Sequence, residues 1–228
     1  DRLQAAKERA TERYPKLMQW DTEPPAEVLV LETPSAPPSL SVLAKALRHN
    51  MAVHCEPGEH SGRRYTEHIV RSFLAGMAVS RILLLKGFSG TGKTSLPVFI
   101  ARALGGYAET VPVQSGWRDR MDLLGHHNSF DRRFIASAFT EEVYKANLVP
   151  DHPVFIVLDE ANLSRVEYYF ADILSELERS RDRHTVKVLP DRLSPEHPRF
   201  LHDGRELVIP RNVWFVLTAN EDESTFEF

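Results

Sequence analysis

Residues 87–94 read Gly-Phe-Ser-Gly-Thr-Gly-Lys-Thr and fit the pattern G-x-x-x-x-G-K-[ST] at every fixed position. The residues before this stretch, 81–86, form a short apolar run that is typical of a buried parallel strand. The residues after it, 95–104, favour a helix. A strand, a glycine-rich loop and a helix in this order are the setting in which such a pattern binds phosphate. We therefore expect an α/β fold organised around residues 87–94, called the glycine-rich loop below.

The residue types in this loop suit a nucleoside triphosphate. Its glycines let the backbone curl so that successive N–H groups point at one anion, and the N-terminus of the following helix adds a partial positive charge. The Lys93 ammonium is placed to reach the β- and γ-phosphates, and the Thr94 hydroxyl to ligate Mg²⁺. An ordinary glycine-rich surface loop is the alternative, and the flanking strand and helix disfavour it. The predicted nucleotide-binding residues are Gly87, Ser89, Gly90, Thr91, Gly92, Lys93, Thr94 and Ser95.

A second apolar run, residues 153–158, predicts a buried strand that ends on the acid pair Asp159 and Glu160. Ligands of open parallel sheets bind at the carboxyl ends of the strands, so Asp159 should emerge beside the glycine-rich loop. One hydroxyl, one carboxylate and phosphate oxygens suit Mg²⁺, which predicts Thr94 and Asp159 as its protein ligands. Glu160 is the candidate that polarises the attacking water. The other interpretation is an ordinary charged strand end.

A third strong strand is predicted at residues 212–218, and Asn220 follows its end. An Asn after a strand is usually a turn former. Here the matching strand end makes Asn220 a candidate to contact the γ-phosphate or the attacking water. The predicted catalytic set is therefore Glu160, Asn220 and Lys93, with Thr218 and Asp222 as weaker candidates.

The remaining segments predict supporting elements and a division into residues 1–40, a helix followed by a proline-rich linker, and residues 41–228, the α/β core. The expected segments are a helix within 1–19, a proline-rich linker at 21–40, a helix capped by Ser41, a polar loop at 55–64, a helix with Ile69, Val70, Phe73, Leu74 and Met77 facing inward, a strand at 107–113, a loop and turn at 116–125, a helix opened by a capping box of Ser164 and Glu167, an irregular excursion at 178–203 and a short strand at 207–209.

Composition excludes several classes of protein. The formal net charge of −4 at pH 7 gives no overall attraction to nucleic acid or anionic membranes, and we find no basic stripe with interleaved aromatics. Cys55 is the single cysteine, so no internal disulfide can form and a reducing cytoplasm is expected. No apolar run is long enough to span a bilayer. The spacing around His126 and His127 resembles no zinc site. The first residue, Asp1, and the last, Phe228, suggest a piece of a longer protein.

These motifs together resemble the AAA+ family, and within it the branch of the McrB-type restriction NTPases. Residues 87–94 match its Walker A motif, and residues 158–170 (LDEANLSRVEYYF) its extended Walker B motif. Residues 218–225 (TANEDEST) are similar to its sensor-1 segment. Weaker similarity covers residues 117–125 (WRDRMDLLG) and the helix at 65–73. The extended Walker B motif is far more specific than Walker A, which many unrelated NTPases share.

The resemblance implies a three-layer P-loop NTPase core with a parallel sheet flanked by helices. It also implies ring assembly, usually hexameric, and hydrolysis at subunit interfaces. The fifth core strand, the helical lid with sensor 2 and the arginine finger should follow sensor 1, and residues 1–228 do not contain them; Arg165 is not assigned as a finger. ATP is the default nucleotide of the wider family, whereas McrB-type proteins use GTP and a nuclease partner. Base selection would depend on residues before the glycine-rich loop, such as those near Tyr65.

The sequence leaves three functions open. The first is an AAA+ NTPase that uses Mg²⁺ and ATP, or GTP, to drive remodelling or translocation, with a nuclease or another effector subunit as partner in a McrBC-like defence system. The second is an oligomeric scaffold that binds nucleotide with little turnover. The third, a P-loop kinase or DNA translocase outside AAA+, ranks lowest because kinases typically lack the Asp-Glu-Ala-Asn pattern of residues 159–162.

Overall fold

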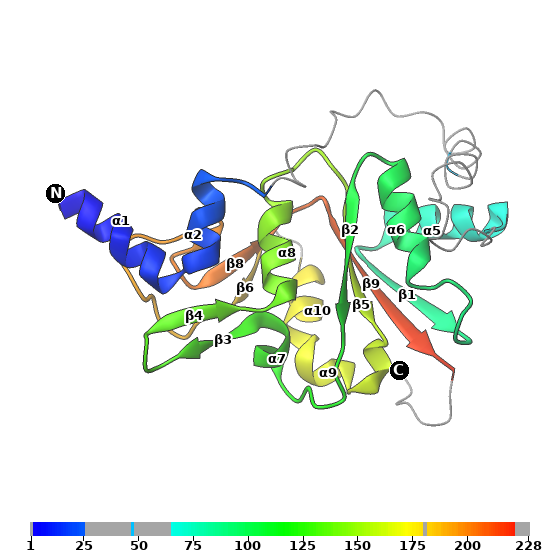
Figure 1. The fold of residues 1–228 in the computed structure, drawn as a ribbon. Helices are drawn as coiled ribbons and strands as arrows, with labels where there is room; N and C mark the ends of the chain where they lie inside the picture. Colours follow the sequence, from blue (N-terminus) through cyan, green and yellow to red (C-terminus); the bar gives the residue numbers. More distant parts are fainter. Residues whose placement is uncertain (1, 26–46, 48–64, 180–181, 222–228) are drawn as a thin grey trace.

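The structure, a computed structural model, describes residues 2–25, 47, 65–179 and 182–221. Its central element is a parallel sheet of four strands in the order β1-β9-β5-β2 (Figure 1). The strands are β1 (Ile82–Gly87), β2 (Tyr107–Pro112), β5 (Val154–Asp159) and β9 (Val213–Asn220). Helices flank this sheet on both sides, so the expected α/β class with a parallel sheet between helices is confirmed.

Alternating residues of the central strands explain why both faces of the sheet are covered. On β5, Val154, Ile156 and Leu158 belong to the larger apolar cluster, which includes α8 (Ala138–Ala146). Phe155 and Val157 belong to a second cluster with α5 (Glu67–Val79) and α6 (Ser95–Ala103). The side chains of these five residues are fully buried, and only Asp159 at the end of β5 is partly exposed. Since successive strand residues point to opposite faces, an unbroken apolar run buries both faces at once.

The first predicted strand is present and parallel, but it is not fully buried as its apolar run predicts. Among the described residues β1 pairs only with β9, and Leu84 is 47% exposed, so β1 is an edge strand and is not fully buried. Hydrophobic run length cannot distinguish an edge from a central strand, because the pairing partner is distant in sequence. The predicted strands at 107–113, 153–158, 207–209 and 212–218 are all confirmed, with β9 continuing through Asn220.

The predicted capping box at Ser164 and Glu167 is wrong. The Ser164 hydroxyl donates to the carbonyl of Trp117, and Arg165 occupies the N-cap position without a side-chain cap. The expected single helix is also divided, since α9 (Val166–Tyr169) and α10 (Ala171–Leu177) meet at buried Phe170. The hydroxyl that local pattern assigns to a cap is used instead in a tertiary contact with a distant loop.

Other segments are more regular than the sequence suggests. The predicted loop at 116–125 contains α7 (Arg120–Leu124), which has a capping box of Asp119 and Asp122. A hairpin of β3 (Gly125–Asn128) and β4 (Arg133–Ala136) follows. The excursion at 178–203 supplies β6 (His184–Lys187) and β7 (Leu201–His202), which pair with β8 (Glu206–Ile209). Ile69, which was expected to face inward, is 41% exposed, whereas Val70, Phe73 and Leu74 are buried.

The N-terminal segment folds as two helices, α1 (Arg2–Arg13) and α2 (Pro15–Thr22), and packs onto the core. Tyr14 and Leu17 are buried in the larger apolar cluster. The Asp21 carboxylate accepts hydrogen bonds from the Tyr144 hydroxyl at 2.6 Å and from the Arg199 N–H at 2.7 Å. Burial, reinforced by the bond to Asp21, raises the pKa of Tyr144. These contacts join the N-terminal helices to α8 and to the loop before β7.

Part of the predicted N-terminal organisation lies outside the described residues. This applies to the linker beyond residue 25, most of the helix expected after Ser41, and the loop at 55–64 with Cys55. Leu47 alone is described in this region, and it is helical and buried in the second cluster.

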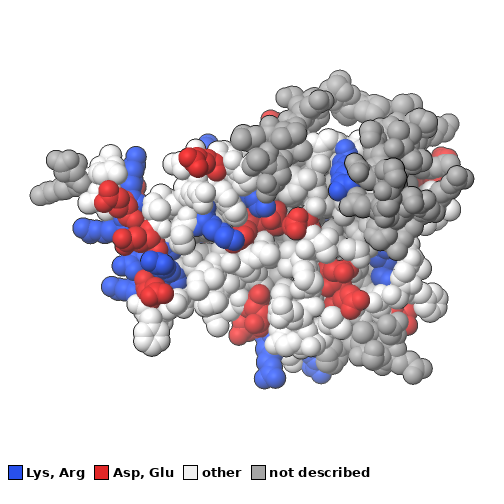
Figure 2. Space-filling view, in the orientation of Figure 1, with Lys and Arg blue, Asp and Glu red and all other residues white. Residues whose placement is uncertain are grey.

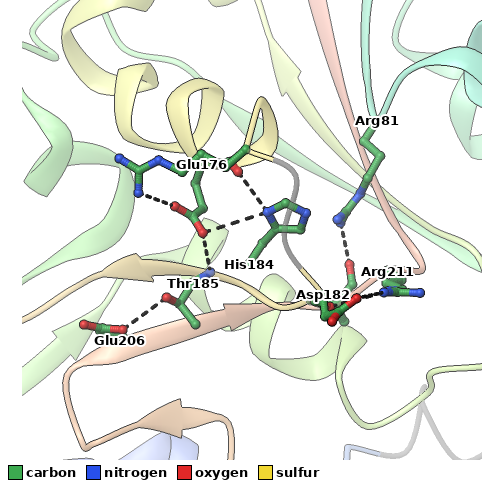
Figure 3. A network of polar contacts seen from close by, with 9 residues as sticks. Arg81, Glu176, Asp182, His184, Thr185, Glu206 and Arg211 are labelled. Carbon is green, nitrogen blue, oxygen red and sulfur yellow. Dashed lines mark hydrogen bonds and ion pairs between the residues drawn. The ribbon is translucent and has the colours of Figure 1, made fainter.

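A polar network joins α10 to the three-stranded sheet (Figure 3). The Glu176 carboxylate lies 3.0 Å from an Arg179 nitrogen and accepts the Thr185 N–H at 3.3 Å, although Glu176 is only 5% exposed. The His184 Nδ1–H donates to the Glu176 carbonyl at 2.8 Å. Nearby, the Arg81 guanidinium donates to the Val213 carbonyl at 3.0 Å, and burial followed by repulsion from Arg211 lowers the pKa of Arg81 to about 10. The network thus joins the sheet of β6, β8 and β7 to α10.

Replacing Glu176 with alanine is expected to lower the free energy of unfolding by about 1–3 kcal/mol, because the Thr185 N–H loses its acceptor. Urea denaturation of both proteins measures this difference. The matched control is Glu178→Ala, an exposed position on the same helix end, which should change stability by less than about 0.5 kcal/mol. Equal effects of the two substitutions would contradict the structural role of Glu176.

Candidate functional site

The carboxyl ends of three neighbouring strands form the candidate site. Gly87 at the end of β1 pairs with Asn220 at the end of β9, and Asp159 ends β5 on the other side of β9. The prediction that Asp159 and the glycine-rich loop emerge at the same edge of the sheet is therefore confirmed. Asn220 lies on the central strand between them.

The glycine-rich loop connects β1 to α6 and uses glycine where no other residue would fit easily. Gly90 and Gly92 have φ values of +78° and +92°, in the region that L residues rarely adopt. A Cβ on Gly92 would also lie 2.6 Å from the Tyr65 hydroxyl oxygen, which donates to the Gly92 carbonyl at 2.8 Å. Ser89 lies in the exposed part of the loop, and Ser95 is the first residue of α6.

The Lys93 ammonium lies between the loop and β9. It donates to the carbonyls of Gly87 and Phe88 at 2.9 and 2.8 Å, and to Oδ1 of Asn220 at 2.7 Å. An ammonium has three N–H groups, and these contacts use all three. A positive charge is thus held at the point where the loop meets the end of the central strand.

Two hydroxyls converge on one oxygen of Asp159. The Thr94 hydroxyl donates to Oδ1 at 2.6 Å, and the Thr218 hydroxyl donates to the same atom at 2.7 Å. Thr94 and Asp159 are the predicted metal ligands, so the fold brings these two hard oxygen donors into contact. Within the described part of the chain, no group of three His, Cys, Asp or Glu side chains could hold a metal. A metal at Asp159 would have to complete its shell with water and ligand oxygens, which fits Mg²⁺ bound together with phosphates.

Glu160 follows Asp159 in an unusual backbone conformation. Its φ and ψ of 52° and 48° lie in the left-handed region, which costs of order 1–3 kcal/mol and persists only where the surroundings impose it. Its N–H donates to the Thr218 hydroxyl at 2.9 Å. Its Oε1 accepts from the Asn220 side-chain amide at 3.0 Å. Asn220 therefore contacts Lys93 through its oxygen and Glu160 through its nitrogen.

The structure brings all three predicted catalytic residues into one network and places further residues around it that lie outside the predicted catalytic set. Thr218, named only as a weaker candidate, contacts both acidic residues. The Asn162 amide, 3% exposed, donates to the Asn220 carbonyl at 3.0 Å. Tyr65 holds the loop at Gly92. The one sequence signal for these contacts is the position of Asn162 within residues 158–170, the stretch that resembles an extended Walker B motif. Asp222 lies outside the described residues.

Comparison with known proteins does not assign a family: no protein-family model matches the chain, and no curated protein matches it. The chemistry of this site must therefore be inferred from its own residues.

The described residues carry both signs of charge on the face drawn in Figure 2. Lys and Arg side chains are interspersed with Asp and Glu, most densely around the N-terminal helices (Figure 2). His126 and His127 lie in β3 of the hairpin and join no metal-binding group in the described ranges. Among the helices whose residues the structure describes, none combines the length and apolarity needed to cross a bilayer.

Proposed function

We propose that the protein is a nucleoside triphosphatase that binds Mg²⁺ with ATP, or alternatively GTP, at the carboxyl ends of β1, β9 and β5. The observation that supports it best is the single hydrogen-bonded network that joins Lys93, Thr94, Asp159, Glu160 and Asn220. These residue types supply a phosphate cradle, a metal anchor and a carboxylate to orient water, the three requirements of phosphoryl transfer to water.

The phosphate chain would lie in the glycine-rich loop. The loop amides and the N-terminus of α6 attract anions, and Lys93 adds a full positive charge. The ammonium now donates to two loop carbonyls and Asn220, and phosphate oxygens are stronger acceptors because they carry charge. A bound triphosphate is therefore expected to take over part of these contacts.

Thr94 and Asp159 would hold the metal. When bound, Mg²⁺ supplies neutralisation of the charge that develops on the phosphate oxygens. The Thr218 hydroxyl occupies Oδ1 of Asp159, which keeps the carboxylate oriented toward Thr94. The protein itself would contribute the orientation of these two hard oxygen ligands, Thr94 and Asp159.

Glu160 would orient a water molecule for attack on the γ-phosphorus and accept its proton at the carboxylate, while the bond from that phosphorus to the oxygen of the departing nucleoside diphosphate breaks. The Asn220 amide holds Oε1 of Glu160 and at the same time contacts Lys93, so the base and the phosphate-binding charge share one support. A general base of this kind contributes typically 10²–10⁴-fold to a rate.

We further propose the AAA+ fold, and its McrB-type branch, as the best account of the motifs at 87–94, 158–170 and 218–225. The parallel sheet flanked by helices is compatible with that core. Ring assembly, a nuclease or other effector partner, and remodelling or translocation driven by hydrolysis are proposals that follow from this resemblance.

Phosphate release from ATP and GTP, measured side by side with and without Mg²⁺, tests this function. We expect Mg²⁺-dependent release from at least one nucleotide. A preference for GTP would support the McrB-type reading, and a preference for ATP a general AAA+ motor. Tight binding without turnover would instead favour a nucleotide-dependent scaffold, and absence of binding would overturn both.

A further inference from the structure

We propose that Thr218 is a positioning residue that sets the geometry of both Asp159 and Glu160 through a single hydroxyl group. The inference rests on the proposed function, because it assigns Thr218 a part in that same site. It concerns the side chain two residues before Asn220 on the central strand β9.

The hydroxyl of Thr218 uses its donor and its acceptor in opposite directions. It donates to Oδ1 of Asp159 at 2.7 Å and accepts the Glu160 N–H at 2.9 Å. A hydroxyl has one O–H donor and two acceptor lone pairs, so one group can serve a carboxylate and a backbone amide together. Two adjacent residues with different proposed roles are thus held by the same atom.

The hydrogen bond from Thr218 to Asp159 fixes which carboxylate oxygen faces Thr94, the other proposed metal ligand. Thr94 and Thr218 both donate to Oδ1, from α6 and β9 respectively. Partners of this kind orient metal ligands, and their loss typically costs 10–100-fold in metal affinity or activity. Without the Thr218 hydroxyl, the hydrogen bond from Thr94, itself a proposed ligand, would be the only one left to the Asp159 carboxylate among the described residues.

The bond to Glu160 helps to hold its left-handed backbone. The Leu163 N–H donates to the Glu160 carbonyl at 2.9 Å, so the residue is anchored on both sides of its α-carbon. This turn ends β5 and leaves Oε1 of Glu160 in contact with Asn220. If the N–H loses its acceptor, the residue can relax toward ordinary backbone geometry, and the carboxylate is then expected to leave Asn220.

Burial makes the hydroxyl hard to replace. Thr218 is 1% exposed, and its neighbours Leu217 and Ala219 are 5% and 1% exposed. Strand packing alone would be served by valine, which has the same branched shape and a high strand propensity. The chemical difference between threonine and valine at this position is the pair of hydrogen bonds to the site.

Thr218→Val and Thr218→Ser, compared in phosphate release, test the proposal. We expect Thr218→Val to lower kcat by about 10–100-fold and to raise the Mg²⁺ concentration at which phosphate release is half-maximal. KM for the nucleotide should change little, because the glycine-rich loop and Lys93 are intact. Serine restores the hydroxyl and should recover most of kcat. The matched control is Thr110→Val on β2 of the same sheet, which should leave kcat and Mg²⁺ dependence unchanged.

Wild-type kcat and Mg²⁺ dependence in Thr218→Val would overturn the proposal, as would a Thr218→Ser variant as impaired as valine. Thermal melting checks folding, and Thr218→Ala, which lacks the hydroxyl without adding bulk, replaces a valine variant that does not fold. If the wild-type protein releases no phosphate, the proposed hydrolysis is wrong, but the positioning role of Thr218 can still be tested by crystal structures. A Glu160 backbone that stays left-handed in the valine variant would overturn that role, and a Glu160 backbone that returns to ordinary geometry would support it.

Discussion

Replacing Lys93 with alanine is expected to weaken nucleoside triphosphate binding by about 100-fold or more and to abolish phosphate release. The substitution removes the charge held between the loop and β9 and the three hydrogen bonds that it makes to Gly87, Phe88 and Asn220. Hydrogen bonds to a charged group contribute about 1.5–3 kcal/mol each, so the loss of two phosphate contacts accounts for this factor. Titration with a fluorescent nucleotide measures binding directly.

Lys86→Ala is the matched control for this experiment. Lys86 lies on β1 and has a half-exposed side chain, and within the described part of the chain its ion pair is a long one of 3.9 Å with Glu221. Its replacement should leave nucleotide affinity within about twofold, since exposed ion pairs contribute little. If Lys93→Ala binds nucleotide as the wild-type protein does, the glycine-rich loop is not the phosphate site.

Replacing Glu160 with glutamine is expected to lower kcat by about 10²–10⁴-fold while nucleotide binding is retained. Glutamine keeps an oxygen at the Oε1 position, so the contact from the Asn220 amide can persist. What is lost is the negative charge that accepts a proton from the attacking water. Phosphate release under saturating nucleotide, together with an independent binding measurement, separates the two effects.

Glu167→Gln provides the comparison, because Glu167 is an exposed acid on α9 outside the hydrogen-bonded network of the site. Its kcat should equal that of the wild-type protein. A Glu160→Gln variant with undiminished turnover would remove Glu160 from the catalytic set. A variant that loses turnover but keeps biological function would favour the scaffold alternative.

The sequence alone predicted the parts of the fold whose signals are local. The apolar runs that became β5 and β9 are continuous and bounded by polar residues, and the helix after the glycine-rich loop follows its pattern directly. The contact between Thr94 and Asp159 was also predictable, because both lie at the carboxyl ends of parallel strands or just beyond them.

Local patterns failed where a partner comes from a distant segment. Ser164 fits a capping box by spacing, yet its hydroxyl donates to Trp117. The run at 81–86 is typical of a buried strand, yet among the described residues β1 pairs on one side only and Leu84 is exposed. Of the small sheet of β6, β8 and β7, only β8 is predicted from the sequence. The segment that contains β6 and β7 is rich in proline and charge, and such short strands of mixed polarity carry little periodic signal.

The sequence by itself determined which residue types stand at the ends of the apolar strands: the glycine-rich loop after β1, the acid pair at the end of β5 and Asn220 at the end of β9. Only the tertiary structure decided that β9 lies between β1 and β5, and so that Asn220 contacts Lys93 on one side and Glu160 on the other. The physical reason is the distance along the chain between the residues that interact. Strand formation depends on neighbours along the chain, whereas strand order and hydrogen-bond partners depend on packing between segments far apart in sequence.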